Sequence, residues 1–95
     1  MDDPYLDILY EQYDKLLRLY KRFEDKKPIM LFDIQDQRGY AYPYNAYKAT
    51  LSKRSQNVLT EQYEAAQKKN QMVVFIRDNK KRRLRSYSLE IEESP

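Results

Sequence analysis

Residues 3–25 read DPYLDILYEQYDKLLRLYKRFED, and this stretch predicts one long amphipathic helix. Asp3 suits the N-cap, because its carboxylate accepts hydrogen bonds from free backbone N–H groups, and Pro4 suits the first turn, where no donor is needed. Apolar residues then recur at alternating steps of three and four, so they form one stripe along the helix. The stripe consists of Leu6, Leu9, Tyr13, Leu16, Tyr20 and Phe23.

This stripe also fits a heptad repeat, so two interpretations stay open. In one, the helix pairs with its copy in a second chain, which predicts a homodimer through the first helix. In the other, the helix lies on the protein's own sheet. Further apolar residues lie outside the stripe and give the helix more apolar surface than one sheet face usually covers, which indicates a partner on its second side. They are Ile8, Tyr10, Leu17 and Leu19.

The rest of the chain predicts two hairpins separated by a second helix. Gly39 is expected to take a positive φ in the first turn, and Ser52 or Ser55 to cap the second helix. The segment 43–51 is predicted to be a loop or a short turn of helix. The buried side of the second helix is expected to be Val58, Leu59, Tyr63 and Ala66. The expected segments are helix 3–25, hairpin 29–42, helix 52–69, hairpin 72–91 and a frayed tail over 92–95.

The element order α-β-β-α-β-β predicts an α+β fold in a single domain covering residues 1–95. We expect an antiparallel sheet of about four strands with the two helices packed on one face. The opposite face would be open to solvent or to a partner. The sequence LYEQY over 9–13 is similar to LTEQY over 59–63, which indicates either a duplication of an αββ unit or a chance similarity.

Composition argues against several functional classes. The 95 residues include no cysteine, no histidine and one glycine, so thiolate chemistry, imidazole acid–base catalysis and a glycine-rich phosphate loop are excluded. We therefore predict a protein that is not an enzyme and uses no cofactor and no metal. The start lacks the features of a signal peptide, no apolar run is long enough to span a bilayer, and the lack of cysteine favours a reducing compartment, so we expect a cytoplasmic protein without membrane contact.

Basic residues are concentrated in the second hairpin, although the formal net charge of the chain is only +3. These residues could bind nucleic-acid phosphates, with exposed tyrosines stacking on bases. They could also contact an acidic protein surface, or simply keep the tip of the hairpin soluble. The candidates are Arg77, Lys80, Lys81, Arg82, Arg83 and Arg85.

Tyrosines form a second candidate surface, because their rings supply apolar contact area with a polar tip. Alternatively, they fill a small core in place of leucine and tryptophan. Of the two functions, we favour a small protein-interaction module, such as an adaptor, regulatory subunit or inhibitor, in which the basic hairpin steers the encounter. The alternative is a nucleic-acid-binding protein that uses the basic hairpin. The candidate protein contacts are Tyr10, Leu17, Leu19, Tyr42, Tyr44 and Tyr47.

Overall fold

The first helical segment bends in the middle. In this computed structural model, which describes residues 3–92, α1 spans Pro4–Glu11 and α2 spans Tyr13–Arg22. The predicted single helix over 3–25 is therefore wrong at Gln12, whose backbone (φ −95°, ψ 5°) leaves helical geometry. The bend has a packing reason: α2 contacts β1 and β2, whereas side chains of α1 and its cap reach β3 and β4. A straight helix would not follow the twisted sheet between these two areas.

The remaining elements follow in the order that the sequence predicts, with one short helix added. α4 starts after Ser52, whose hydroxyl accepts a hydrogen bond from the backbone N–H of Ser55. The segment 43–51, predicted to be a loop or a short turn of helix, contains α3. The bounds are Pro28–Asp33 for β1, Arg38–Pro43 for β2, Tyr44–Ala49 for α3, Lys53–Lys68 for α4, Gln71–Asp78 for β3 and Arg83–Glu90 for β4.

The sheet is mixed, so the prediction of a wholly antiparallel sheet is wrong. Its four strands have the order β2-β1-β3-β4. β1 pairs with β2, and β3 with β4, as antiparallel hairpins, whereas the two central strands β1 and β3 run parallel. The reason lies in the connection between the hairpins, because α3 and α4 form a crossover long enough to bring β3 beside β1 in the same direction.

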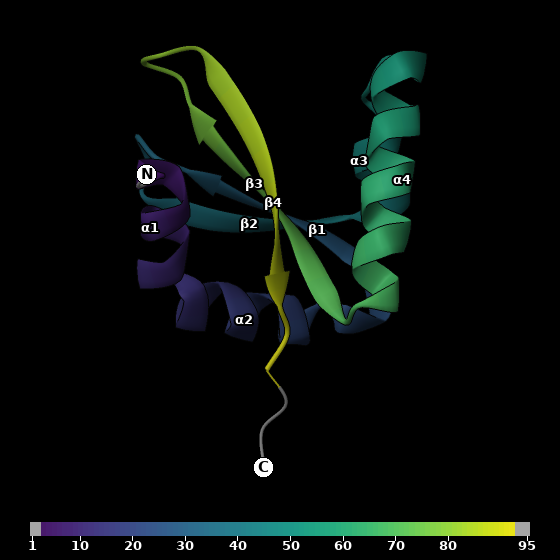
Figure 1. The fold of residues 1–95 in the computed structure, drawn as a ribbon, viewed down its shortest axis with the longest axis horizontal. Coiled ribbons are helices and arrows are strands. Elements are labelled where there is room, and N and C mark those ends of the chain that lie inside the picture. Colours follow the sequence, from purple (N-terminus) through teal and green to yellow (C-terminus); the bar gives the residue numbers. More distant parts are fainter. Residues whose placement is uncertain (1–2, 93–95) are drawn as a thin grey trace.

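Helices cover both faces of this sheet (Figure 1). Met30, Phe32 and Val74 pack with α1 and α2, whereas Ile29 and Val73 pack with α3 and α4. The two helices expected on one face, 3–25 and 52–69, therefore lie on opposite faces, and the face expected to be open is covered by α3 and α4. The physical reason is that the central strands carry continuous apolar runs, which supply side chains to both faces.

Residues of the heptad pattern in the first helical segment pack against the protein's own sheet. Leu9, Leu16 and Tyr20 are buried in the core that α1 and α2 form with the sheet. This burial supports the interpretation that the segment lies on its own sheet. It leaves these side chains unavailable for a coiled coil with a second copy.

The two hairpins have the same turn geometry. In each, a buried aspartate ends the first strand, and its carboxylate accepts the backbone N–H three residues later. The fourth turn residue is left-handed in both, with φ 51° at Gln37 and 53° at Arg82. Gly39 was expected to supply the positive φ and does not. It lies in β2, where a Cβ would come within 3.1 Å of Leu16 Cδ2, so close packing is what favours glycine there.

The LYEQY and LTEQY sequences do not occupy equivalent places in the two halves. A left-handed residue precedes the first strand of each hairpin, Lys27 in one half and Asn70 in the other. Counted back from these positions, the buried Leu59 and Tyr63 of α4 correspond to Leu16 and Tyr20 of α2. The sequence similarity is therefore displaced by seven residues, or about two helical turns, from the structural correspondence.

Candidate functional site

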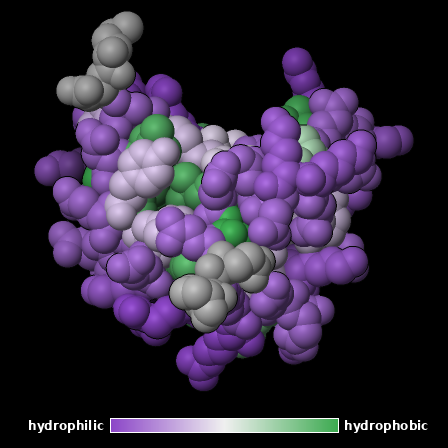
Figure 2. Space-filling view, turned by 60° about the horizontal axis from the view of Figure 1, so that its bottom comes forward, coloured by the Kyte–Doolittle hydropathy of each residue, from purple (hydrophilic) through white to green (hydrophobic). Residues whose placement is uncertain are grey.

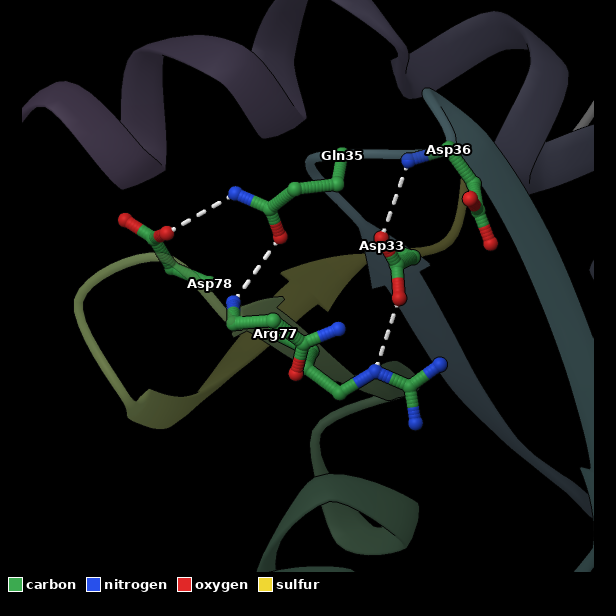
Figure 3. Close-up of polar contacts among 6 residues, drawn as sticks. Asp33, Gln35, Asp36, Arg77 and Asp78 are labelled. Atoms are coloured by element: carbon green, nitrogen blue, oxygen red, sulfur yellow. Dashed lines mark hydrogen bonds and ion pairs between the residues drawn. The ribbon is translucent and has the colours of Figure 1, made fainter.

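A polar cluster joins the two hairpin turns at the carboxyl ends of β1 and β3 (Figure 3). Its centre is Gln35 of the first turn, whose side-chain amide bonds the second turn twice. Gln35 Nε2 donates to Asp78 Oδ1 at 3.0 Å, and the backbone N–H of Asn79 donates to Gln35 Oε1 at 2.8 Å. The cluster thus fixes the position of one turn relative to the other.

The two carboxylates of this cluster are buried and fully engaged. Asp33 accepts the backbone N–H of Asp36 at 3.0 Å and Arg77 Nε at 2.8 Å. Asp78 also accepts the Tyr5 hydroxyl at 2.8 Å. The backbone bond from Asp36, with help from Arg77, lowers the pKa of Asp33, and the Tyr5 and Gln35 bonds lower the pKa of Asp78.

The hydrogen bonds of this cluster hold the first turn to the second, and the lowered pKa values keep both carboxylates charged. Both carboxylates are ionised near neutral pH, so neither can act as a general acid there. No buried side-chain nitrogen or oxygen within residues 3–92 lacks a hydrogen-bond partner. Over the same residues, acidic side chains form no group of three or more that could hold a metal ion.

The basic residues of the second hairpin do not form one surface. Arg77 points to the face of α3 and α4, where Asp33 binds it. Side chains of successive strand residues point to opposite faces of the sheet, and those of Arg83 and Arg85 point to the face of α1. Arg85 Cζ lies 5.9 Å from the centroid of the Tyr5 ring. Only Lys80, Lys81 and Arg82 lie at the tip. A single phosphate-binding surface over 77–85 is therefore not what the structure presents.

The candidate tyrosines pack mainly on one another and on the face of α4. The Tyr47 ring lies 5.9 Å from that of Tyr42 and 5.4 Å from that of Phe75, while the Tyr44 ring stacks 4.1 Å from Tyr63. All three candidates, Tyr42, Tyr44 and Tyr47, are partly buried.

The candidates on the first helical segment differ from one another. Tyr10 on α1 is 60% exposed. Leu17 and Leu19 on α2 instead pack partly against the core. Of the three, Tyr10 alone presents most of its side chain for contact with a partner.

An apolar groove lies between α3 and α4 on one side and β3 and β4 on the other. Its cavity of about 280 Å³ is lined by apolar side chains, with Arg54, Gln62 and Ser86 among the polar residues at its rim. Val58 was expected to be buried, yet it is 61% exposed on this groove. The sequence could not reveal the groove, because it depends on how α4 sits over the edge of the sheet. The apolar lining is Tyr47, Leu51, Val58, Leu59, Phe75 and Leu84.

β4 forms one edge of the sheet and is the strand nearest to the viewer in Figure 1. The backbone N–H of Ile91 donates to Asn70 on the side of β3. Because successive residues of a strand alternate, the backbone groups of Leu84, Ser86 and Ser88 point outward, away from β3. Within residues 3–92, no hydrogen bond reaches these outward groups.

Exposed apolar side chains gather along this edge. Three large ones are exposed in the described part of the chain: Tyr10, Val58 and Leu84, the last by 53%. Leu84 belongs to β4, Val58 lines the groove with Ser86, and Tyr10 lines a second hollow with Ser88 and Glu90. On the side that Figure 2 presents, the surface is mostly hydrophilic, with smaller hydrophobic areas. We call the strand and these flanking side chains the β4 edge.

The fold and this surface describe a small α+β protein with an open sheet edge. Comparison with protein-family models, with curated proteins and with solved structures finds no match. Among residues 3–92, no helix has the length and apolar character needed to cross a membrane.

Proposed function

We propose that this protein is a protein-interaction module without enzymatic activity, and that it binds an extended segment of a partner along the β4 edge. The observation that carries the proposal is that all three exposed large apolar side chains of residues 3–92 border one open strand. A bound strand would satisfy the outward backbone groups, and its alternate side chains would meet the groove beside Leu84. The basic tip would steer an acidic partner toward the surface.

Nucleic-acid binding is the second candidate. It is supported by stacked rings on the face of α4, where Tyr40 and Tyr42 lie 6.2 Å apart and the Arg38 guanidinium lies 5.5 Å from Tyr40. We rank it second, because Arg77 is engaged by Asp33 and the other basic residues of the hairpin point to the opposite face or lie at the tip.

A library of displayed peptides, selected on the immobilised full chain, tests the first candidate. We expect the selected peptides to be strand-forming and to bind the protein, but not the variant Leu84→Asp, which places a charge in the groove. Ser88→Pro, which removes one outward N–H, is expected to weaken the same peptides. Asn57→Asp adds the same charge at an exposed position of α4 that faces away from the groove, so it is the matched control and should bind as the unaltered protein does.

The measurement is the dissociation constant of each peptide for each variant. Selected peptides that bind all four proteins equally would contradict binding at the β4 edge. Circular dichroism and urea unfolding establish that each variant is folded before its binding is compared.

A further inference from the structure

We infer that the segment bound at the β4 edge is β4 of a second copy of this chain, paired antiparallel and centred on Ser86. The inference rests on the proposed function, because it names the partner of the same surface. It adds the order of charges along the strand, and it uses the positions of the open backbone groups to set the register of the pairing.

Charge is segregated along β4. The basic tip precedes the strand, and the first residues of the strand are also basic. Glu90 and Glu92 lie at its other end. Parallel pairing of two copies would place like charges beside each other, which is unfavourable. Antiparallel pairing places the basic start of each strand beside the acidic end of the other, so the strand is complementary to itself. This agrees with the two-fold symmetry that most homodimers adopt.

The backbone sets the register. Toward the end of β4, the Tyr13 hydroxyl donates to the Glu90 carbonyl and accepts the Glu92 N–H, so these groups are already used. The open groups are those of Leu84, Ser86 and Ser88. Pairing centred on Ser86 places Leu84 of each copy opposite Ser88 of the other, and all three residues then form ladder bonds.

The same register pairs the charges. Arg82 comes opposite Glu90 of the second copy, and the two-fold axis repeats this pair. Both copies present the same face, so the exposed Val58 and Leu84 of each gather around the axis. On the other face, Tyr10 lies beside the acidic half of β4 and approaches Arg83 and Arg85 of the second copy, a cation–π arrangement.

Sedimentation velocity of the full chain over a range of concentrations tests the inference. We expect a concentration-dependent dimer that weakens as salt is raised, because the paired charges are exposed. Two double variants each reverse the charge at one end of β4. One is Lys80→Glu with Arg82→Glu, and the other is Glu90→Lys with Glu92→Lys. Each alone places like charges together and should weaken self-association by at least about tenfold. An equimolar mixture restores opposite charges at both ends and should form a dimer.

A matched control changes charge elsewhere. Lys15→Glu with Arg18→Glu reverses two exposed residues of α2 and should associate as the unaltered chain does. A chain that stays monomeric, a reversal variant that dimerises unchanged, or a mixture that stays monomeric would each overturn the inference. If the chain is monomeric but Leu84→Asp still abolishes binding of selected peptides, the β4 edge binds a different strand. The proposed function then stands while the second copy is ruled out.

Discussion

Single buried residues decide how the two hairpin turns are held. Asp78 lies at the end of β3, 6% exposed, and its carboxylate accepts hydrogen bonds from α1, from the first turn and from its own turn. Gln35 completes the link by bonding both Asp78 and the backbone of Asn79. The aspartate is visible in the sequence, but its partners are not, because Tyr5 and Gln35 are far from it along the chain.

This network predicts how stability depends on pH. The bonds from Tyr5 and Gln35 lower the pKa of Asp78 in the folded protein, so the unfolded chain takes up its proton first as pH falls. The stabilisation is complete above the ordinary carboxyl pKa of about 3.9 and is lost as pH falls through the lower folded value. We expect Asp78→Asn to reduce stability near neutral pH and to make the loss toward acid pH shallower.

Urea unfolding at a series of pH values measures this effect. Asp7→Asn, on the exposed side of α1, is the control, because it alters a carboxylate and leaves the hydrogen bonds between the turns in place. An Asp78→Asn curve that runs parallel to that of the unaltered protein down to acid pH would show that the carboxylate does not contribute in this way.

At the scale of elements, each of the two turns contains one residue whose backbone conformation costs free energy. Gln37 and Arg82 have left-handed backbones without being glycine, and this conformation costs an L-residue about 1–2 kcal/mol. Glycine removes that cost and adds a smaller loss of chain entropy. We therefore expect Gln37→Gly and Arg82→Gly each to stabilise the fold by about 0.5–1 kcal/mol.

The free energy of unfolding in urea, at concentrations where the chain is monomeric, tests this expectation. Lys80 lies in the same turn as Arg82 but does not have a positive φ. Lys80→Gly therefore only increases the entropy of the unfolded chain and should not stabilise the fold. Loss of stability in both left-handed positions would indicate that the side chains there contribute more than the backbone costs.

Local patterns predicted the elements better than their assembly. Ser52 caps α4 as the pattern indicates, because capping depends on residues a few positions apart. The bend at Gln12 was not predicted, since the apolar stripe continues through it. Both helices must follow a twisted sheet, and only contacts with distant strands show where the stripe changes direction.

At the scale of the whole molecule, the distribution of charge separates the two candidate functions. The net charge is modest, and the basic residues of the second hairpin are divided between two faces and the tip. We expect labelled mixed-sequence RNA and DNA to show no binding by fluorescence anisotropy at near-physiological salt, with at most weak binding at low salt. Binding that persists at the higher salt, and is lost when residues 80–85 are neutralised, would favour the nucleic-acid candidate instead.

Local patterns predict the α+β class, the element order and the positions of the four strands, because periodicity, caps and turn residues act over short distances. Tertiary structure decided the parallel pairing of β1 and β3 and the division of helices between two faces. It also decided the exposure of Val58 on the groove. These features depend on the order of the strands in the sheet. The local sequence around an apolar residue such as Val58 is the same whether or not a distant part of the chain covers its side chain. The candidate site belongs to this second group, because an edge exists only once the order of strands is set.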